Sequence, residues 1–347
     1  MILNTKQTLG KQEVPCYFIF GDSLLDNGNN NNLNTTLKAN YFPYGIDFPG
    51  GVVTGRFTNG RTMGDIIGEN LGFEDYIPAF ATAKGQEIKN GVNYASAGSG
   101  IRNETGSHLG DRICMDRQLE NHQTTISNLA SLLGNQTAVD NLLSQCLYIV
   151  GIGNNDYINN YFQPQYYETS KLYTTKQYAG ILEKQYSHQL TKLHKFGARK
   201  ICIFGLSPSG CTPAMRDMYS KGLQICADSV NDAVGLFNMK LKAVVDNLNT
   251  KLNAANFTYI NIFDIQFGYL QYNSTETTID QPCCQVSEKY KGLCIPNQNP
   301  CILRSAHIFY DDYHPTETVN AFTASRAYIA LLPSDAHPMD IHQLVQR

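Results

Sequence analysis

The sequence of 347 residues contains no tryptophan and no apolar run of the roughly 18 residues that a membrane-spanning helix requires. Positive charge is also scarce, because 27 Lys and Arg residues stand against 30 Asp and Glu residues, for a net charge of −3. The longest basic cluster is the pair Arg199 and Lys200, so the concentrated positive surface of a nucleic-acid-binding protein is missing. We therefore expect neither a membrane span nor a nucleic-acid partner.

Several motifs of known chemistry are absent as well. The Gly-x-Ser-x-Gly elbow of the α/β-hydrolases does not occur, and its nearest approach, GLSPS at residues 205–209, lacks the last glycine. There is no His-Glu-x-x-His and no paired Cys-x-x-Cys, the spacings that hold zinc. The segment GIGNND at residues 151–156 begins like a dinucleotide-binding loop but has no third glycine. We therefore predict a protein without a metal ion or an organic cofactor.

Signals for secretion are present. The chain has ten cysteines and five Asn-x-Ser/Thr sequons, and both disulfides and N-linked glycans belong to oxidising compartments. The first residues, MILNTK, lack the apolar core of a secretory signal, so we expect a secreted glycoprotein whose signal is absent from this sequence. The sequons begin at Asn34, Asn103, Asn135, Asn256 and Asn273.

The cysteines are spread unevenly. Cys211 and Cys226 bracket one polar loop, which favours a disulfide between them. Cys16 and Cys202 lie inside apolar runs, so we predict that both are free buried thiols. Four more crowd a late segment rich in Gly, Pro, Asn and Gln, and three pairings among them are open. These four are Cys283, Cys284, Cys294 and Cys301.

Five short apolar or β-branched runs recur with helical or loop segments between them, which is typical of buried parallel strands. The runs are residues 17–20, 92–95, 147–150, 201–204 and 259–262. Apolar residues recur at helical spacing over residues 176–196, just before a glycine, and again over residues 228–252. The alternation of strand, crossover helix and strand predicts an α/β fold with a doubly wound sheet.

No linker, composition break or internal repeat divides the chain. We therefore predict a single domain over residues 14–340, preceded by an N-terminal extension of residues 1–13. The one low-complexity stretch is the Asn-rich tract at residues 26–34. Asparagine tolerates left-handed backbone and favours turns, so the tract is either a flexible, water-facing loop or a segment that shapes the site.

A serine, two glycines and an asparagine follow the ends of the first three predicted strands. Ser23 comes after the first strand, Gly98 and Gly100 after the second, and Asn155 after the third. Open α/β sheets bind ligands at the carboxyl ends of their strands, so these residues are expected to converge.

Asp311 and His314 stand three residues apart, just before a predicted closing helix over residues 316–332. A serine hydroxyl needs a base to remove its proton during attack, and histidine titrates in the right range. A carboxylate can hold the imidazole in one tautomer and stabilise the imidazolium. We predict that Ser23 is the nucleophile, His314 its base and Asp311 the partner of His314, with Asp312 as an alternative partner.

Attack on an ester leaves negative charge on an oxygen, which preorganised donors must stabilise. The predicted donors are the Ser23 amide, a glycine amide and the side-chain NH₂ of Asn155. Both Gly98 and Gly100 are candidates for the glycine, and the sequence does not choose between them.

Together these blocks resemble the plant-type GDSL esterase/lipases, a branch of the SGNH hydrolases. The matching segments are FGDSLLDNGNN at 20–30, VNYASAGSGI at 92–101, GNNDY at 153–157 and DDYHPTE at 311–317. GRFTNG at residues 55–60 and the late cysteine-rich loop also fit. The resemblance covers about residues 14–340. It implies a three-layer α/β/α, flavodoxin-like SGNH fold with a central parallel sheet of about five strands, secretion, and hydrolysis of carboxylic esters without a cofactor.

The predicted function is therefore carboxylic ester hydrolysis through an acyl-serine, with a small-molecule or lipid ester as substrate. Two alternatives are acyl transfer to an alcohol by the same residues, and a secreted binding protein with a disused site. The complete residue set argues against the second. Aromatic residues near the motifs are candidates for an apolar acyl slot or for the core. They are Phe20, Tyr94, Tyr157, Tyr161, Phe162 and Tyr313.

Overall fold

A computed structural model describes residues 12–220, 224–273 and 281–347 of the protein. Most of the predicted N-terminal extension, residues 1–13, lies outside the described residues. The single domain predicted for residues 14–340 stays a prediction. Among the described residues, no helix is both long and apolar enough to cross a membrane.

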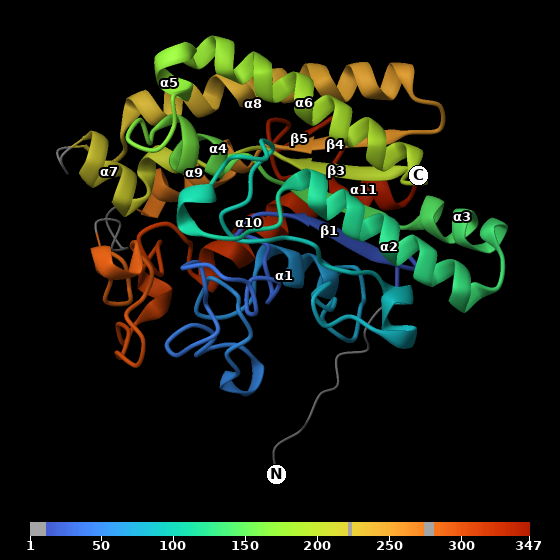
Figure 1. Ribbon diagram of the computed structural model, residues 1–347, viewed down its shortest axis with the longest axis horizontal. Coiled ribbons are helices and arrows are strands. Elements are labelled where there is room, and N and C mark those ends of the chain that lie inside the picture. Colours follow the sequence, from blue (N-terminus) through green and yellow to red (C-terminus); the bar gives the residue numbers. More distant parts are fainter. Residues whose placement is uncertain (1–11, 221–223, 274–280) are drawn as a thin grey trace.

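A five-stranded sheet forms the centre of the molecule, in the order β1-β2-β3-β4-β5 (Figure 1). Strands β1 to β4 are parallel, and β5 pairs antiparallel with β4. The apolar and β-branched composition of the parallel strands suits a sheet buried on both faces. The strands are β1 (Tyr17–Gly21), β2 (Leu147–Gly151), β3 (Lys200–Phe204), β4 (Asn256–Ile260) and β5 (Ala336–His337).

Two strand predictions need correction. Residues 92–95 run parallel to β1 and exchange backbone hydrogen bonds with Ile19, but they form only isolated bridges at Asn93, because the Gly21 amide that would continue the ladder donates to the Gln118 side chain at 2.9 Å. The last parallel strand is Asn256–Ile260 rather than residues 259–262, and it ends there because Asn261 caps the helix that follows by accepting from the Asp264 amide. When residues 92–95 are counted with the parallel strands, their chain order across the sheet is the flavodoxin-like 2-1-3-4-5.

Helices cover both faces of the sheet, so the fold is the predicted three-layer α/β/α sandwich (Figure 1). The first face packs on α2 (Met115–Leu133), α3 (Gln136–Gln145), α6 (Thr175–Lys195) and α8 (Asp228–Lys251). The second face packs on α1 (Met63–Asn70), α9 (Ile262–Asn273), α10 (Glu317–Tyr328) and α11 (Ile341–Val345). The predicted helices over residues 176–196, 228–252 and 316–332 are therefore present as α6, α8 and α10.

Alternate residues of each strand enter different layers, as the pleat of a strand requires. Phe18 and Phe20 of β1 pack among α2, α6 and α8, whereas Tyr17 and Ile19 pack among α1, α10 and α11. Shorter helical segments connect the layers. They are α4 (Asn154–Asp156), α5 (Thr169–Leu172), α7 (Pro213–Tyr219), a π turn at Tyr157–Tyr161, and 3-10 turns at Pro49–Gly51, Gly85–Asn90, Ser107–Leu109, Ser209–Cys211, Glu288–Tyr290 and Arg304–Ala306.

Four disulfides close the structure. The predicted Cys211–Cys226 bridge is present, and the late cysteines pair as Cys283–Cys301 and Cys284–Cys294. The prediction for Cys16 is wrong, because it pairs with Cys146, whereas Cys202 is a free buried thiol as predicted. The sheet register explains the error: Tyr17 lies opposite Leu147, so the residues that precede these two strands are neighbours.

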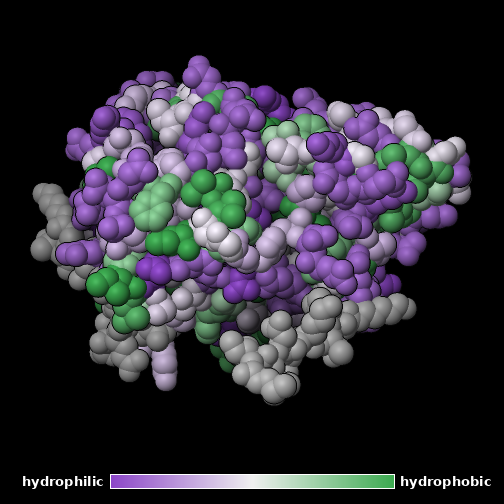
Figure 2. Space-filling model, turned by 90° about the horizontal axis from the view of Figure 1, so that it is seen from below, coloured by the Kyte–Doolittle hydropathy of each residue, from purple (hydrophilic) through white to green (hydrophobic). Residues whose placement is uncertain are grey.

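The face of the molecule seen from below is mostly hydrophilic, and its hydrophobic side chains form small separate groups (Figure 2). The cysteine-rich segment and the loops between β1 and α1 lie below the sheet in Figure 1. These two segments are far apart in the chain but share one hydrophobic cluster, which contains Tyr44, Phe57, Cys284 and Cys294.

Candidate active site

The site lies at the carboxyl ends of β1 and β2, where open α/β sheets bind ligands. Ser23 is two residues beyond the last residue of β1, and Asn155 lies in α4, just beyond β2. Ser23 is half-buried, and Asn155 is buried with 4% exposure. The parallel pairing of Gly21 with Gly151 brings the two loops together.

Ser23, His314 and Asp311, the three residues predicted to be catalytic, form one chain of hydrogen bonds. The Ser23 Oγ and the His314 Nε2 are 2.8 Å apart. The His314 Nδ1 lies 2.8 Å from both carboxylate oxygens of Asp311. Asp311 is fully buried and His314 is 6% exposed, so water competes little for these contacts.

Asp311 is held by three donors besides the imidazole. The backbone amides of Tyr313 and His314 donate to its Oδ1 at 2.9 and 2.8 Å. The Tyr44 hydroxyl donates to its Oδ2 at 2.6 Å. No pattern in the sequence indicates Tyr44 as part of the site, because it stands 267 residues from Asp311 and belongs to none of the four matching blocks.

Asp312 does not take the place of Asp311 in the contacts of the imidazole. Its backbone amide donates to Gly292 O at 3.0 Å, and its carbonyl accepts from Ala214 N at 3.2 Å. Burial raises the pKa of Asp312 to about 7, and the nearby carboxylates of Asp311 and Asp217 add to this shift.

The two glycine candidates differ in what they face. Gly98 lines the same cavity as Ser23, Asn155 and His314, and its φ of 77° suits glycine. Gly100 packs away from that cavity, since a Cβ there would meet Asp156 Oδ2 at 2.6 Å.

The Asn155 side chain is oriented at both ends. Its Nδ2 donates to Ser99 O at 3.0 Å, and its Oδ1 accepts from Asn159 Nδ2 at 2.6 Å. An amide nitrogen carries two protons, so one proton of Asn155 is available to a ligand in the cavity.

The first part of the Asn-rich tract, residues 26–30, is buried, whereas Asn32 and Asn34 are exposed. Asn29 Nδ2 donates to Asn93 O and Ala95 O at 2.9 and 2.8 Å, and Asn30 Nδ2 donates to Leu37 O and Ala97 O at 3.1 Å. Both asparagines are 1% exposed. For residues 26–30 the interpretation as a flexible, water-facing loop is therefore wrong, and this part of the tract shapes the site by holding residues 93–97.

Asp26 ties the same two segments together. Its Oδ1 accepts from the amides of Gly28 and Asn29, both at 2.8 Å, and its Oδ2 accepts from Ala97 N at 3.0 Å. Burial raises the pKa of Asp26 to about 6, although the three hydrogen bonds from these amides act to lower it. The carboxyl thus connects the Asn-rich tract to Ala97, just beyond residues 92–95.

A second polar cluster lies beside Ser23. Asn154 Oδ1 accepts from Ser207 N, Ser207 Oγ and Ser209 Oγ at 3.0 to 3.1 Å, and its Nδ2 donates to Asp22 Oδ2 at 3.4 Å. Burial raises the pKa of Asp22 to about 6. Asn154 therefore connects the loops that follow β1, β2 and β3.

A cavity of about 200 Å³ opens beside Ser23. Much of its lining is apolar, which suits a hydrocarbon group. Of the six aromatic candidates only Tyr313 lines it, whereas Phe20, Tyr94 and Tyr157 are core residues. The apolar lining includes Leu24, Leu37, Phe57, Leu109, Ile158, Met218 and Leu293.

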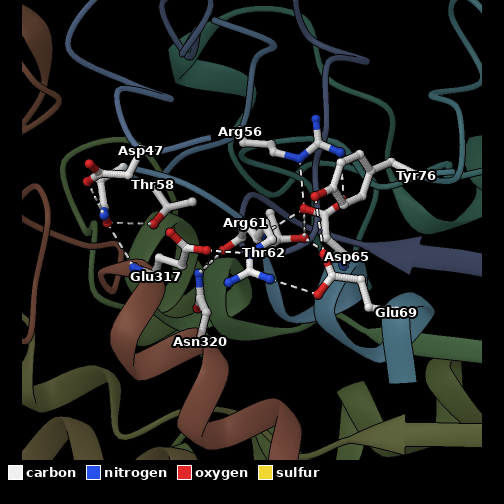
Figure 3. A network of polar contacts seen from close by, with 11 residues as sticks. Asp47, Arg56, Thr58, Arg61, Thr62, Asp65, Glu69, Tyr76, Glu317 and Asn320 are labelled. Carbon is white, nitrogen blue, oxygen red and sulfur yellow. Dashed lines mark hydrogen bonds and ion pairs between the residues drawn. The ribbon is translucent and has the colours of Figure 1, made fainter. Parts of the chain in front are cut away.

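The segment GRFTNG at residues 55–60 contacts the residues that follow His314, and Glu317 at the start of α10 lies beside it (Figure 3). Thr58 Oγ1 donates to Pro315 O at 3.0 Å, and Asn59 Oδ1 accepts from Glu317 N at 2.8 Å. Arg61 forms an ion pair with Glu317 at the start of α10. These contacts hold the residues on the C-terminal side of His314.

The same segment is anchored to α1 by a buried ion pair (Figure 3). The Arg56 guanidinium contacts both oxygens of Asp65 at 2.6 and 2.7 Å, with both side chains 5% exposed. Burial alone would raise the pKa of Asp65, but Arg56 and Thr62 lower it below its ordinary value.

Comparison with known proteins finds similarity over nearly the whole chain. The sequence profile of the GDSL-like Lipase/Acylhydrolase family matches residues 17–327. Two GDSL esterase/lipases of Arabidopsis thaliana are each 46% identical, over 344 and 339 residues that cover 96% of this chain and 92% of the relative. A third from the same plant is 44% identical over 351 residues, 99% of this chain and 96% of the relative.

Proposed function

Because this chain belongs to the GDSL-like lipase/acylhydrolase family and is thus a serine ester hydrolase, we propose that it works through an acyl-serine formed on Ser23. The observation that carries this proposal is the hydrogen-bonded chain from Ser23 Oγ through His314 to Asp311. A buried carboxylate against one imidazole nitrogen and a half-exposed hydroxyl against the other is the arrangement that activates a serine.

In the first step, Ser23 Oγ attacks the ester carbonyl carbon while His314 Nε2 takes the hydroxyl proton. Asp311 keeps the other proton of the imidazole on Nδ1, which leaves Nε2 free to act as the base. The C–O bond to the alcohol then breaks, and His314 returns the proton to the departing oxygen. The acyl group is left on Ser23 as an ester.

In the second step, water attacks the acyl-serine, and His314 takes a proton from that water. The acid leaves when the C–O bond to Ser23 breaks, and the proton returns to Ser23 Oγ. One water is consumed, and one acid and one alcohol are formed, so the enzyme ends in its starting state.

The proposed oxyanion donors are the amides of Ser23 and Gly98 and the side chain of Asn155. Gly98 is preferred to Gly100 because it lines the cavity with Ser23, whereas Gly100 packs against Asp156. Removal of one such donor typically lowers turnover by roughly 10²–10³.

We also propose that the protein is secreted and glycosylated. Its four disulfides fit an extracellular protein. Asn34, Asn103 and Asn135 are exposed, so their sequons are accessible, whereas Asn256 begins a strand of the sheet. The Asn273 side chain lies outside the described residues. Enzymatic removal of N-glycans followed by mass measurement should locate glycans at the first three sites.

The test of the mechanism is Ser23→Ala, with Ser207→Ala as the matched control. Both hydroxyls line the cavity, but Ser207 Oγ bonds Asn154 and not the imidazole. On nitrophenyl esters of increasing chain length, Ser23→Ala should lose essentially all turnover, and Ser207→Ala should stay within about tenfold of wild type. A fluorophosphonate should label Ser23. Turnover by Ser23→Ala within about tenfold of wild type would rule out Ser23 as the nucleophile.

A further inference from the structure

Tyr44 is a buried tyrosine whose hydroxyl lies between the Asp311 carboxylate and the cysteine-rich segment. It donates to Asp311 Oδ2 at 2.6 Å and accepts from the backbone amide of Cys294 at 3.1 Å. Its side chain is fully buried. The hydroxyl proton therefore points to the carboxylate, since the amide of Cys294 is itself a donor.

The ring of Tyr44 is packed from several sides. It makes edge contacts with Tyr41, Phe57 and Tyr310 at centroid distances of 5.3 to 5.9 Å. Tyr310 also donates to Pro43 O at 2.6 Å, which fixes the backbone just before Tyr44. A ring held in this way keeps its hydroxyl in one place.

The loop closed by the Cys284–Cys294 disulfide supports the same position. Cys294 contacts two tyrosines through its backbone: its amide donates to Tyr44, and its carbonyl accepts from the Tyr41 hydroxyl at 2.8 Å. The Cys284 amide donates to Tyr310 O at 2.9 Å, directly before Asp311. The disulfide loop thus contacts both Tyr44 and the segment that carries the acid.

We propose that Tyr44 is a positioning residue for Asp311 and that the Cys284–Cys294 loop holds Tyr44 in that position. The proposal rests on the proposed function, because it takes Asp311 as the partner of His314. Tyr44 touches no substrate. It acts by fixing the carboxylate against the imidazole and by drawing part of the carboxylate charge toward its own proton.

Loss of the Tyr44 hydroxyl has two expected effects on the reaction. The carboxylate is less well fixed, so His314 is held less firmly at Ser23 and turnover falls. The carboxylate also directs more of its charge to the imidazole, which favours the protonated imidazolium. Other titratable groups near the pair are unchanged by this substitution. They are Asp22 beside His314, and Asp312, Tyr41, Tyr310 and Tyr313 beside Asp311.

The test compares Tyr44→Phe with Tyr41→Phe on a soluble nitrophenyl ester. Both variants lose a hydroxyl bonded to Cys294, but only Tyr44 contacts Asp311. Tyr44→Phe should lower kcat by about tenfold with little change in KM, as expected for one hydrogen bond to a charged group. The acidic limb of its pH profile of kcat/KM should move to higher pH, because a base that is more easily protonated needs a higher pH to lose its proton. Tyr41→Phe should leave that limb unchanged.

A cysteine variant tests the second half of the proposal. Replacement of both Cys284 and Cys294 by serine should lower kcat and move the acidic limb in the same direction as Tyr44→Phe. Adding Tyr44→Phe to that variant should then cost much less than it does alone, because the two changes act through one contact. Additive effects, or a Tyr44→Phe limb that stays at the wild-type pH, would overturn the proposal. If Ser23→Ala also remained active, the proposed function itself would have failed.

Discussion

Ser23 and Asn155 stand directly beyond neighbouring strands β1 and β2, whereas Asp311 and His314 stand on a loop held by side chains and disulfides. The positions of Ser23 and Asn155, the first half of the site, are set by the pairing of β1 with β2, in which Gly21 lies opposite Gly151. The second half depends on side chains from distant segments. The Tyr44 hydroxyl donates to Asp311, and the Thr58 hydroxyl donates to the carbonyl of Pro315.

This difference separates two kinds of dependence on the rest of the molecule. Sheet pairing is made by backbone groups, which most substitutions leave intact. The Asp–His loop relies on individual side chains and on the Cys283–Cys301 and Cys284–Cys294 bridges. The Asp–His half should therefore be more sensitive to single substitutions outside the site than the half that contains Ser23 and Asn155.

The largest effect is expected at the centre of the Asp–His half. Asp311→Asn should lower kcat by roughly 10³–10⁴, because the amide cannot hold the imidazole in the reactive tautomer. Asp312→Asn is the matched control in the next position and should change kcat by less than about tenfold, because the imidazole bonds both oxygens of Asp311. Steady-state kinetics on one soluble ester measures both. Equal losses would make Asp312 an alternative partner of His314.

In the sheet-supported half, a smaller effect is expected. Asn155→Ala should lower kcat by roughly 10²–10³ with little change in KM, because its amide proton is needed only as charge develops on the substrate oxygen. Asn154→Ala should instead cost stability, about 1–3 kcal/mol, because Ser207 N and Ser209 Oγ lose their acceptor. Kinetics and chemical denaturation on both variants separate the roles. A loss at Asn155 confined to stability would remove it from the oxyanion site.

Much of this architecture could be predicted from local sequence. Strands β1, β2 and β3 could be predicted because apolar runs of four residues suit a sheet buried on both faces, and α6 and α8 because their apolar spacing is helical. Ser23 and Asn155 could be predicted to lie close together because each follows a strand of one parallel sheet, whereas the sequence left Gly98 and Gly100 as alternatives after residues 92–95.

Contacts made by single side chains across the chain could not be predicted. Nothing near Tyr44 indicates a partner at residue 311, and nothing near Cys16 indicates that β2 is the neighbour of β1. The Asn-rich tract has the composition of a loop, and its burial could not be predicted because three of the four carbonyls that accept from Asn29 and Asn30 belong to residues more than sixty positions away. Such contacts appear only when the fold has been formed.

A substitution in the Asn-rich tract tests how the half of the site that contains Ser23 and Asn155 contributes to stability. Asn30→Ala removes donors from Leu37 O and Ala97 O and the acceptor of Ser96 Oγ, so the free energy of unfolding should fall by on the order of 3 kcal/mol. Asn32→Ala, at an exposed position in the same tract, should change it by less than about 0.5 kcal/mol. Urea denaturation compares the two. Similar small losses would show that the tract is not a structural part of the site.

The smallest effect is expected at the outer end of the contacts that support the Asp–His half. Arg304 pairs with Asp47, whose carboxylate accepts from Asn59, and the Arg304 and Asp47 side chains are 26% and 30% exposed. Arg304→Gln should therefore lower the free energy of unfolding by less than about 1 kcal/mol, and still less at high salt, with kcat unchanged. Arg56→Gln is the buried counterpart in the same segment and should cost about 3–5 kcal/mol, because it leaves the Asp65 carboxylate without its guanidinium. If Arg304→Gln lowered kcat as strongly as Tyr44→Phe, the geometry of the Asp–His half would depend on its surface contacts and not on its buried ones.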